Sequence, residues 1–435
     1  MSKARDQQRR DAGLPSTVDG VVRDMGHGGD AVAETELGVV FVPGALPGER
    51  VRIEGLFRQR RTLFGRLAQV LEPSPDRIVP SCDRVERCGG CPWMHATKGF
   101  QERWKRSLLE ATLARACGEE PAPPLSFRPA DQALGYRRRA RLAWEVRGKK
   151  QTLGYRRRRS RRLMDAPECG VLRPSLLQAL ARVRETLLPQ LQGRGEVSIA
   201  LGHGGHAAIA LTTDGDASPR SYEAAAELAE ETNIAGVALY AAGLGTPAIW
   251  GDPRDVSAGV DGLPVVGTIA GFSQAQDAMN LSLVVEVERL AQVRDQRVLE
   301  LYAGCGNLTI ALAPEASQLT VVELDPAASA ACRDNLALRG LDRVRVVAAD
   351  ASQALAKGRY DVVVLDPPRS GAKDALAGIV ACRPDRIVYV SCSPPTLGRD
   401  LAQLRELGYV LETATGFDMF PQTAHMEAVV RLRRR

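Results

Sequence analysis

The sequence predicts an α/β protein of three parts: a small N-terminal β-barrel, a central α+β region and a C-terminal Rossmann-like domain. Short apolar stretches separated by glycine and proline turns fill residues 14–72, a pattern typical of an OB-like barrel. Residues 73–270 combine helix and strand patterns with a cysteine cluster and a dense basic stretch. Strand and helix patterns alternate over residues 271–435, which indicates a parallel sheet covered by helices.

The composition is that of a globular protein. Hydrophobic residues make up 44% of the chain, which is enough for sizeable cores, and the net charge of +6 is modest. No apolar run reaches the roughly 18 residues that a membrane helix requires, and the polar residues 1–11 do not resemble a signal peptide. We therefore expect a cytoplasmic protein, monomeric and without an obligate protein partner.

The barrel is predicted from four strand patterns, at residues 18–22, 38–42, 49–53 and 64–70. Arg58, Arg60 and Arg61 share one loop of this part. They would either contact phosphate groups or form a solvated charged loop, and the sequence favours neither.

The cysteines suggest a metal site. Their odd number, nine, and uneven spacing argue against a disulfide framework. Cys82, Cys88 and Cys91 form a C-x5-C-x2-C cluster among glycine and proline residues, and Cys169 is the candidate fourth ligand. Four thiolates suit zinc and an iron–sulfur cluster alike, so the spacing leaves both open. The other cysteines, Cys117, Cys305, Cys332 and Cys382, are expected to be packing residues.

A basic stretch lies between Tyr136 and Leu163, with Glu145 as its only acidic residue. Trp144 and Tyr155 also lie within it. Such density favours a surface that follows phosphates and offers aromatic platforms to bases over a merely solvated face, and it suits RNA at least as well as DNA. The basic residues are Arg137, Arg138, Arg139, Arg141, Arg147, Lys149, Lys150, Arg156, Arg157, Arg158, Arg159, Arg161 and Arg162.

The C-terminal part begins with a helix at 281–293 and continues with strands, which are expected at 297–301, 319–323, 343–348, 361–365 and 386–390. A helix is expected from residue 326. Residues 409–416 and 426–432 read as a final strand pair, which would add an antiparallel edge to the parallel sheet.

The ends of the first three strands predict a nucleotide-type cofactor. Gly304 and Gly306, in an E-x-x-x-G-x-G loop, let a ligand approach backbone N–H groups. Glu323 ends the second strand, where an acid accepts hydrogen bonds from ribose hydroxyls, and Asp350 follows the third strand, where it suits an adenine amino group. Together these features predict S-adenosylmethionine.

The ends of the next strands predict the reaction. Asp366 precedes two prolines that give a stiff loop in the cleft, and Cys392 follows an apolar strand. A thiolate that adds to C6 of a pyrimidine makes C5 nucleophilic enough to take a methyl group. Glu427 is the candidate base for the proton that C5 then loses.

Three stretches carry a family resemblance: Leu-Asp-Pro-Pro-Arg-Ser-Gly-Ala at 365–372, Val-Tyr-Val-Ser-Cys at 388–392, and Asp-Met-Phe-Pro-Gln-Thr-Ala-His-Met-Glu at 418–427. With them the chain resembles the RNA uracil-5 methyltransferase family over nearly its whole length. The resemblance implies that Cys392 is the nucleophile and Glu427 the base. It also implies cofactor contacts by Gln274, Tyr302, Asn307, Glu323, Asp350 and Asp366.

The resemblance extends to the other two parts. The barrel is similar to the family's TRAM domain, an RNA-binding module. Cys82, Cys88, Cys91 and Cys169 resemble the [4Fe–4S] ligands of its ribosomal RNA branch, so the resemblance favours a structural iron–sulfur cluster over zinc. Cytosine-5 RNA methyltransferases keep a second cysteine where Arg369 stands here, which favours uracil, and 23S ribosomal RNA is the expected substrate.

Three positions depart from the family pattern. Gln276 and Ser393 stand where asparagine is common, and Asp350 occupies a position where asparagine also occurs. No catalytic group is lost, but the first two changes can alter contacts to the target base. The alternatives are a tRNA uracil-5 methyltransferase, a non-catalytic RNA-binding factor and an iron–sulfur redox protein.

Overall fold

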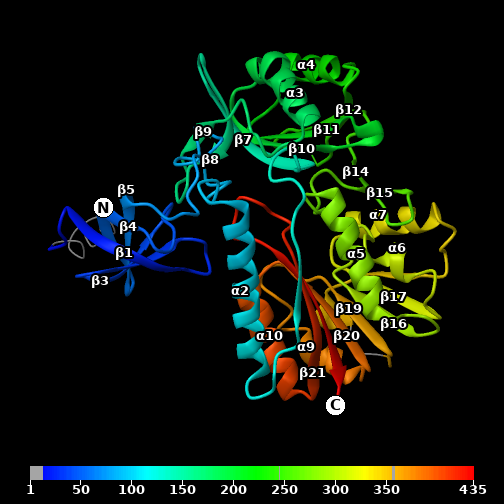
Figure 1. The fold of residues 1–435 in the computed structure, drawn as a ribbon. Coiled ribbons are helices and arrows are strands. Elements are labelled where there is room, and N and C mark those ends of the chain that lie inside the picture. The colour runs from blue at the N-terminus through cyan, green and yellow to red at the C-terminus, as the bar shows by residue number, and fades with distance from the viewer. Residues whose placement is uncertain (1–12, 244, 355–357) are drawn as a thin grey trace. The chain divides into compact units, whose positions relative to one another are not determined.

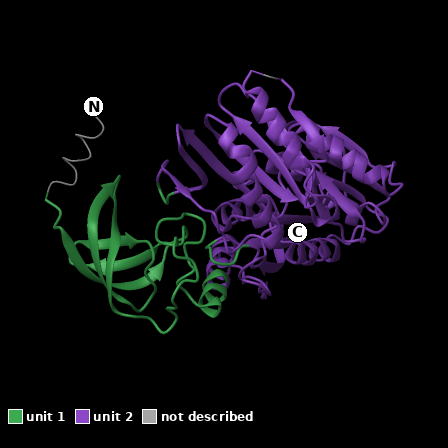
Figure 2. Ribbon diagram, turned by 90° about the horizontal axis from the view of Figure 1, so that it is seen from above, with its two compact units in different colours: residues 1–105, 157–159, 420–424 green, residues 106–156, 160–419, 425–435 purple. Residues whose placement is uncertain are grey.

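The computed structural model describes residues 13–243, 245–354 and 358–435 (Figure 1). The expectation about residues 1–11 lies outside this range. The chain divides into two compact units, which Figure 2 colours separately. One unit comprises residues 1–105, 157–159 and 420–424, and the other comprises residues 106–156, 160–419 and 425–435.

The first unit contains a closed five-stranded barrel with the strand order β1-β2-β3-β5-β4, which confirms the predicted barrel. Its core forms because apolar residues alternate along the strands; Val18 and Val22, for example, are buried, with exposed Asp19 between them. The sequence pattern did not predict β2, a short strand directly after the glycine-rich turn. The strands are β1 (Thr17–Met25), β2 (Ala31–Thr35), β3 (Gly38–Val42), β4 (Arg50–Gln59) and β5 (Thr62–Glu72).

Trp93 organises the remainder of the first unit. Its indole Nε1 donates to the carbonyl of Gly29 at 2.8 Å, and its backbone N–H donates to the carbonyl of Gln422 at 2.9 Å. The unit also includes the first turns of α2 (Lys98–Cys117), where buried Lys105 donates to the carbonyl of Phe420 at 3.0 Å. These bonds tie the segment 420–424 to residues far away in the sequence.

The second unit contains two large sheets. The first, mostly antiparallel, has the order β13-β12-β11-β10-β7-β8-β9, with helices α3 (Pro174–Arg182) and α4 (Pro219–Ala229) contributing to its core. Short π and 3-10 turns follow at Val183–Leu187, Leu188–Gln190 and His203–Gly205, and a two-stranded sheet pairs β14 (Asp255–Ala258) with β15 (Pro264–Gly267). The large sheet comprises β7 (Arg139–Arg147), β8 (Lys150–Arg156), β9 (Leu163–Asp165), β10 (Gly193–Leu201), β11 (Ala207–Thr213), β12 (Ile234–Tyr240) and β13 (Ala248–Gly251).

The second sheet of this unit has the order β18-β17-β16-β19-β20-β22-β21-β6. Strands β16 to β20 are parallel, and β22 and β21 form the predicted antiparallel pair. β6 joins β21 in parallel, which the sequence pattern did not predict because β6 lies far upstream. The strands are β6 (Leu125–Arg128), β16 (Arg297–Leu301), β17 (Gln318–Glu323), β18 (Arg345–Ala348), β19 (Val362–Leu365), β20 (Arg386–Ser391), β21 (Tyr409–Phe417) and β22 (Glu427–Arg434).

Helices alternate with these strands, as predicted, and α5 packs against β19, β20 and β22. It begins at Asp277, earlier than the sequence pattern suggested. No helix among the described residues is both long and apolar enough to cross a membrane. The helices are α5 (Asp277–Ala291), α6 (Thr309–Leu312), α7 (Pro326–Ala337), α8 (Ala351–Ala354), α9 (Leu376–Ala381) and α10 (Pro394–Glu406).

Candidate active site

The predicted site residues lie at the carboxyl ends of the parallel strands. Tyr302 follows β16, Glu323 ends β17, Asp366 follows β19 and Cys392 follows β20. β16 and β19 are neighbours in the sheet. The strands that follow β16 in the chain, β17 and β18, extend the sheet on one side, and β20, which follows β19, extends it on the other. Such a switch point is where open α/β sheets bind their ligands. The topology therefore collects these side chains at one edge.

The antiparallel strand β22 brings Glu427 to the same edge. Ser391 at the end of β20 is paired with Ala428, so Glu427 at the start of β22 lies beside Cys392. Glu427 is buried and Cys392 partly buried. The charges of Asp366 and Arg369, from the loop after β19, act on both. Two residues distant in sequence thus meet next to the loop that carries the two prolines.

The environment of Cys392 disfavours the free thiolate in the resting protein. Burial raises the pKa of its thiol to about 11, the carboxyl groups of Glu427 and Asp366 add to this, and Arg369 opposes them. Cys392 directly precedes Ser393, the N-cap of α10, and a helix N-terminus favours a nearby anion. The resting thiol is therefore protonated, with Arg369 and α10 available to stabilise the thiolate.

The two carboxyl groups of the site are also shifted. Burial raises the pKa of Asp366 to about 7. The pKa of Glu427 is raised well above its ordinary value, first by burial and then by Asp366, while Arg369 lowers it. Among the described residues, Glu427 Oε2 has no hydrogen-bond donor. A buried carboxyl with a raised pKa and an unoccupied oxygen is equipped to take a proton.

The loop after β16 is held by Glu323. The backbone N–H groups of Gly304 and Asp325 each donate to a different carboxylate oxygen of Glu323, both at 2.8 Å. Gly306 has φ 92°, and a Cβ there would lie 2.9 Å from Cys332 Sγ, so only glycine fits. Tyr302 also has a positive φ of 61°, a strained conformation for a non-glycine residue. The sharp turn of this loop thus depends on Glu323 as well as on its glycines.

Glu300 is the acidic residue of the E-x-x-x-G-x-G motif, for which the sequence predicted no role. It lies fully inside β16, and burial raises its pKa to about 8, with Asp366 and Glu323 adding to the shift and Thr309 opposing it. An acid between the buried residues Leu299 and Leu301 is the signal that points to it. Glu300 is thus a third carboxyl group with a raised pKa, beside Asp366 and Glu427.

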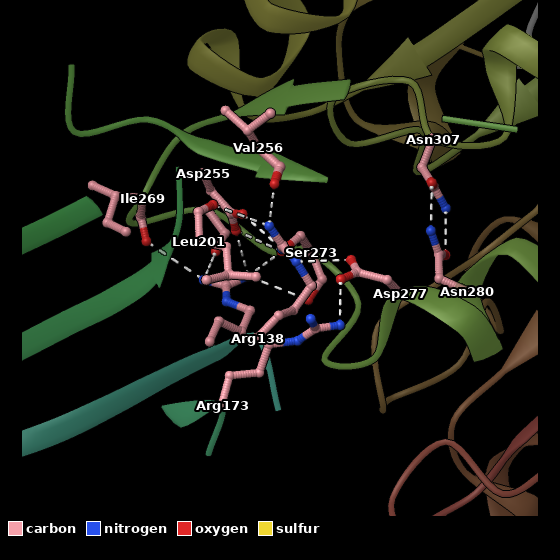
Figure 3. A network of polar contacts seen from close by, with 12 residues as sticks. Arg138, Arg173, Leu201, Asp255, Val256, Ile269, Ser273, Asp277, Asn280 and Asn307 are labelled. Carbon is pink, nitrogen blue, oxygen red and sulfur yellow. Dashed lines mark hydrogen bonds and ion pairs between the residues drawn. The ribbon is translucent and has the colours of Figure 1, made fainter. Parts of the chain in front are cut away.

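Arg138 is the centre of a buried polar network (Figure 3). Its guanidinium forms ion pairs with Asp255 at 2.7 Å and with Asp277 at 2.9 Å. It also donates to the carbonyl oxygens of Leu201 and Val256 and to Ser273 Oγ. The guanidinium thereby joins the strand β10 and the short strand β14 to the start of α5.

The same network fixes the segment that contains Gln274. Ser273 Oγ donates to Asp255 at 2.6 Å, and the carbonyl of Ala275 accepts the backbone N–H of Arg138 at 3.0 Å. Gln274 and Gln276 are buried, and the Oε1 atoms of both lack a hydrogen-bond donor within the described part of the chain. Their amides are therefore held in place with capacity to bind a further group.

Asn307 is already engaged. Its side-chain amide exchanges two hydrogen bonds with that of Asn280 on α5, at 2.9 and 3.0 Å (Figure 3). Asp350, in contrast, lies near the surface, where hydrogen bonds from Ser352 lower its pKa. The structure thus places both predicted cofactor contacts around the sheet edge, but in different states of pairing.

Part of the prediction for the basic stretch is wrong. Tyr136 and Trp144 are buried, and Trp144 Nε1 donates to the carbonyl of Thr212 at 3.0 Å, so neither ring is a platform for bases. For Trp144 the cause is the alternation of β7, in which Leu142, Trp144 and Val146 enter the core. The exposed cations of the stretch are Arg141, Arg147, Lys149, Lys150, Arg156, Arg157, Arg159, Arg161 and Arg162.

The cysteine cluster does not form a metal-holding group in the part of the chain that the structure describes. Cys82, Cys88 and Cys91 belong to the first unit and Cys169 to the second. Among the described residues, no three histidine, cysteine, aspartate or glutamate side chains are grouped closely enough to hold a metal ion. Of the expected packing cysteines, Cys117, Cys332 and Cys382 are buried and Cys305 is partly buried.

The strand order and the loops at its carboxyl edge define an S-adenosylmethionine-type methyltransferase fold. The crystal structure of Pyrococcus abyssi tRNA (uracil-54, C5)-methyltransferase in complex with S-adenosyl-L-homocysteine has this fold, with a TM-score of 0.75 and 23% identity. That match covers 95% of this chain and 99% of the other.

Sequence comparison is more specific. Residues 268–435 match the family model described as tRNA (Uracil-5-)-methyltransferase. The 23S rRNA (uracil(1939)-C(5))-methyltransferase RlmD of Alkalilimnicola ehrlichii is 35% identical, over 95% of this chain and 96% of that protein. RlmD of Shewanella sediminis is 33% identical, over 94% of each. The chain belongs to the RNA uracil-C5 methyltransferase family.

Proposed function

We propose that this protein methylates C5 of a uridine in 23S ribosomal RNA through a covalent adduct between Cys392 and C6 of the base. The placement of Cys392 beside Glu427 at the end of β20 supports this reaction most directly. The RlmD relatives support 23S ribosomal RNA as the substrate, because their names give it and their matches cover almost the whole chain. The target uridine must leave its stack to reach a partly buried thiol.

The proposed reaction proceeds in several steps. Once deprotonated, Cys392 Sγ bonds to C6, and the electron pair of the C5–C6 double bond passes into an enolate. S-adenosylmethionine would supply the methyl group on a sulfonium, and transfer to C5 would break the sulfur–methyl bond and leave S-adenosyl-L-homocysteine. Glu427 then removes the proton from C5, the C5–C6 double bond re-forms, and the thiolate leaves. Arg369 offsets the negative charge on Cys392 and Glu427 throughout.

The proposed cofactor contacts are Gln274, Tyr302, Asn307, Glu323, Asp350 and Asp366. Each oxygen of Glu323 already accepts one backbone N–H, which leaves lone pairs for ribose hydroxyls. The buried Oε1 of Gln274 is available to a donor. Asn307 would have to share or exchange its pairing with Asn280 when the cofactor binds.

The exposed cations of the β7–β8 hairpin and the barrel are proposed to hold the RNA around the target. On the barrel, Phe57 and Phe64 stack with ring centroids 5.5 Å apart, and the Arg159 guanidinium lies 4.8 Å from the Phe64 centroid. Partly exposed rings next to arginine suit single-stranded RNA, which combines stacking with phosphate contacts.

A structural [4Fe–4S] cluster on Cys82, Cys88, Cys91 and Cys169 is proposed from the sequence motif alone, since the described side chains do not form a metal-holding group. No step of the reaction involves it. Anaerobic purification is expected to give a brown protein with about four irons per chain. A colourless, zinc-loaded preparation would contradict the cluster.

The adduct is tested with RNA that carries 5-fluorouridine, whose C5 cannot release a proton. With S-adenosylmethionine, the wild-type protein should become covalently attached to this RNA, and Cys392→Ala should not. Cys117→Ala is the matched control, because Cys117 is a buried cysteine whose pKa is also raised by burial. Attachment of the Cys392→Ala variant would refute the proposal.

The base is tested with ordinary uridine RNA. Glu427→Gln keeps the size of the side chain but cannot accept the C5 proton, so the methylated adduct should accumulate and turnover should fall by at least about a hundredfold. Denaturing gels and methyl-transfer assays measure the two quantities. Normal turnover by this variant would assign the proton to another group.

A tRNA substrate is the second candidate, because the matching family model and the similar solved structure carry tRNA names. Methylation of 23S ribosomal RNA fragments and of tRNA transcripts, compared by kcat/KM, decides between the two. Mapping of 5-methyluridine in a deletion strain then identifies the nucleotide.

A further inference from the structure

Behind the Cys392 loop lies a buried carboxylate that the reaction does not use. Asp400, fully buried on α10, accepts the Tyr389 hydroxyl at 2.7 Å and the backbone N–H of Ala372 at 2.8 Å, both on Oδ2. Tyr389 belongs to β20, and Ala372 ends the proline loop that begins at Asp366. One carboxylate oxygen therefore joins the strand that carries Cys392 to the loop that carries Asp366 and Arg369.

Arg399 completes this contact. Its guanidinium pairs with Asp400 Oδ1 at 2.7 Å and donates to the carbonyl of Ser370 at 2.8 Å. Between the two anchored residues lies Gly371, with φ 80°, where a Cβ would be 2.5 Å from both Arg399 and Asp400. Glycine is required there because the loop lies directly on the carboxylate.

The loop is held from this inner side. Pro368, Arg369 and Ser370 are exposed, while Ala372 and Asp400 are buried. Within the loop, the N–H of Gly371 donates to the carbonyl of Pro368 at 2.8 Å, which closes the turn that presents Arg369. A buried carboxylate with three donors on its two oxygens is costly to disturb, so the turn is rigid where it meets α10.

We propose that Asp400, with Tyr389 and Arg399, is a positioning residue that fixes the Asp366–Ala372 loop so that Arg369 faces Cys392 and Glu427. This role rests on the proposed function, since it matters only if Cys392 must form a thiolate. Asp400 itself touches no reacting atom; it acts through the loop.

The charges around Cys392 show what the positioning controls. Glu427 approaches it from β22, and Asp366 and Arg369 approach from the loop after β19. The two carboxyl groups raise the pKa of Cys392 and Arg369 lowers it. A loop that moves away from its anchor therefore reduces the stabilisation of the thiolate by Arg369, and adduct formation would require a higher pH.

Tyr389→Phe tests this role, with Tyr409→Phe as the matched control. Both tyrosines are buried in the same sheet, and each hydroxyl donates one hydrogen bond, Tyr389 to Asp400 at 2.7 Å and Tyr409 to the carbonyl of Pro384 at 2.9 Å. The Tyr389 hydroxyl also accepts the backbone N–H of Ala372 at 3.2 Å, so it contacts the loop directly as well as through Asp400. The rate of adduct formation with 5-fluorouridine RNA is measured over a pH series, at saturating S-adenosylmethionine and well below each variant's Tm.

We expect Tyr389→Phe to form the adduct about tenfold more slowly and to shift its pH profile upward. Tyr409→Phe should remain within about twofold of the wild type, with an unchanged profile, although a similar hydrogen bond is removed. Equal rates and equal pH profiles for the two variants would overturn the role of Asp400. Attachment of Cys392→Ala to the RNA would instead overturn the proposed function, so the two failures are distinct.

Asp400→Asn extends the test. The amide keeps the size of the side chain but removes the charge that pairs with Arg399, so we expect a larger decrease, about a hundredfold in adduct rate. If this variant folds poorly, Tyr389→Phe still decides the question. A folded Asp400→Asn with the wild-type rate and pH profile would refute the proposal.

Discussion

The beginning of the basic stretch and its middle, at the β7–β8 turn, lie in opposite environments. At the beginning, Arg138 is buried and surrounded by Asp255, Asp277 and backbone carbonyl groups. At the β7–β8 turn, Arg147, Lys149 and Lys150 are exposed. The residue types are nearly the same, yet the first group holds the protein together and the second faces solvent.

This difference shows that charge density along a sequence does not by itself identify a binding surface. A strand places alternate side chains on opposite faces: Arg141 and Arg147 of β7 fall on its exposed positions, whereas Arg138, directly before the strand, is buried. The decisive information is whether carboxylates elsewhere in the chain are available to pair with them. For Arg138 these partners, Asp255 and Asp277, lie more than a hundred residues away, and nothing in the sequence around Arg138 indicates them.

The largest effect on stability is expected from a change at Arg138. Replacing it by Met leaves buried Asp255 with the more distant Arg139, at 3.8 Å, and partly buried Asp277 with Arg173, so we expect the free energy of unfolding to fall by about 3–5 kcal/mol. Affinity for S-adenosyl-L-homocysteine should fall as well, because Ser273 and Gln274 lose their support. Denaturant unfolding and calorimetry measure the two effects. Arg147→Met, at the exposed β7–β8 turn, should change neither quantity, and equal effects of both variants would contradict the distinction.

Buried Glu300, an acid without an ion pair to an arginine in the described residues, is expected to make the stability depend on pH. Burial raises its pKa from 4.5 to about 8, so the folded protein binds a proton that the unfolded chain releases. Its contribution to stability is therefore complete at low pH and is lost as the pH rises through this interval, by about 1.4 kcal/mol per pH unit. Glu300→Gln should not show this loss. Its stability relative to the wild type should thus increase from about pH 5 to about pH 8, and parallel stability curves would show that Glu300 does not titrate there.

The smallest stability effect is expected at the exposed turn. Lys149→Gln combined with Lys150→Gln should change the free energy of unfolding by no more than about 0.5 kcal/mol. If both lysines bind phosphates, the variant should bind RNA more weakly, and the slope of log affinity against log salt should decrease by about 0.7 for each phosphate that is no longer neutralised. Unchanged affinity and slope would place the RNA on another surface.

Much of the candidate site follows from sequence because it lies where parallel strands end. Tyr302, Glu323, Asp366 and Cys392 each stand at the end of, or just after, a short predicted strand, and parallel topology then brings them to one edge. The alternation of strand and helix was sufficient for this step. The barrel could be predicted for a similar reason, since turn residues separate its strands.

Contacts between distant segments could not be predicted in this way. β6 joins the sheet from outside the predicted domain, and Asp400 receives bonds from two separate elements. Neither shows a periodicity or a motif, because each depends on packing that forms only in the folded chain. Trp144 illustrates the same limit, since its burial follows from the partner strand β10 and not from its basic neighbours.

The pairing of β22 with β20 has a consequence for insertions and deletions. Because side chains alternate along a strand, a shift of β22 by one residue would turn Glu427 to the opposite face of the sheet. The pairing of β21 with β22 already has an irregularity between Leu411 and Thr413, at the end far from Glu427. Insertions and deletions are therefore expected to be tolerated around that bulge. A single residue inserted or deleted between Glu427 and Val430 would instead turn Glu427, the proposed proton acceptor, away from the site.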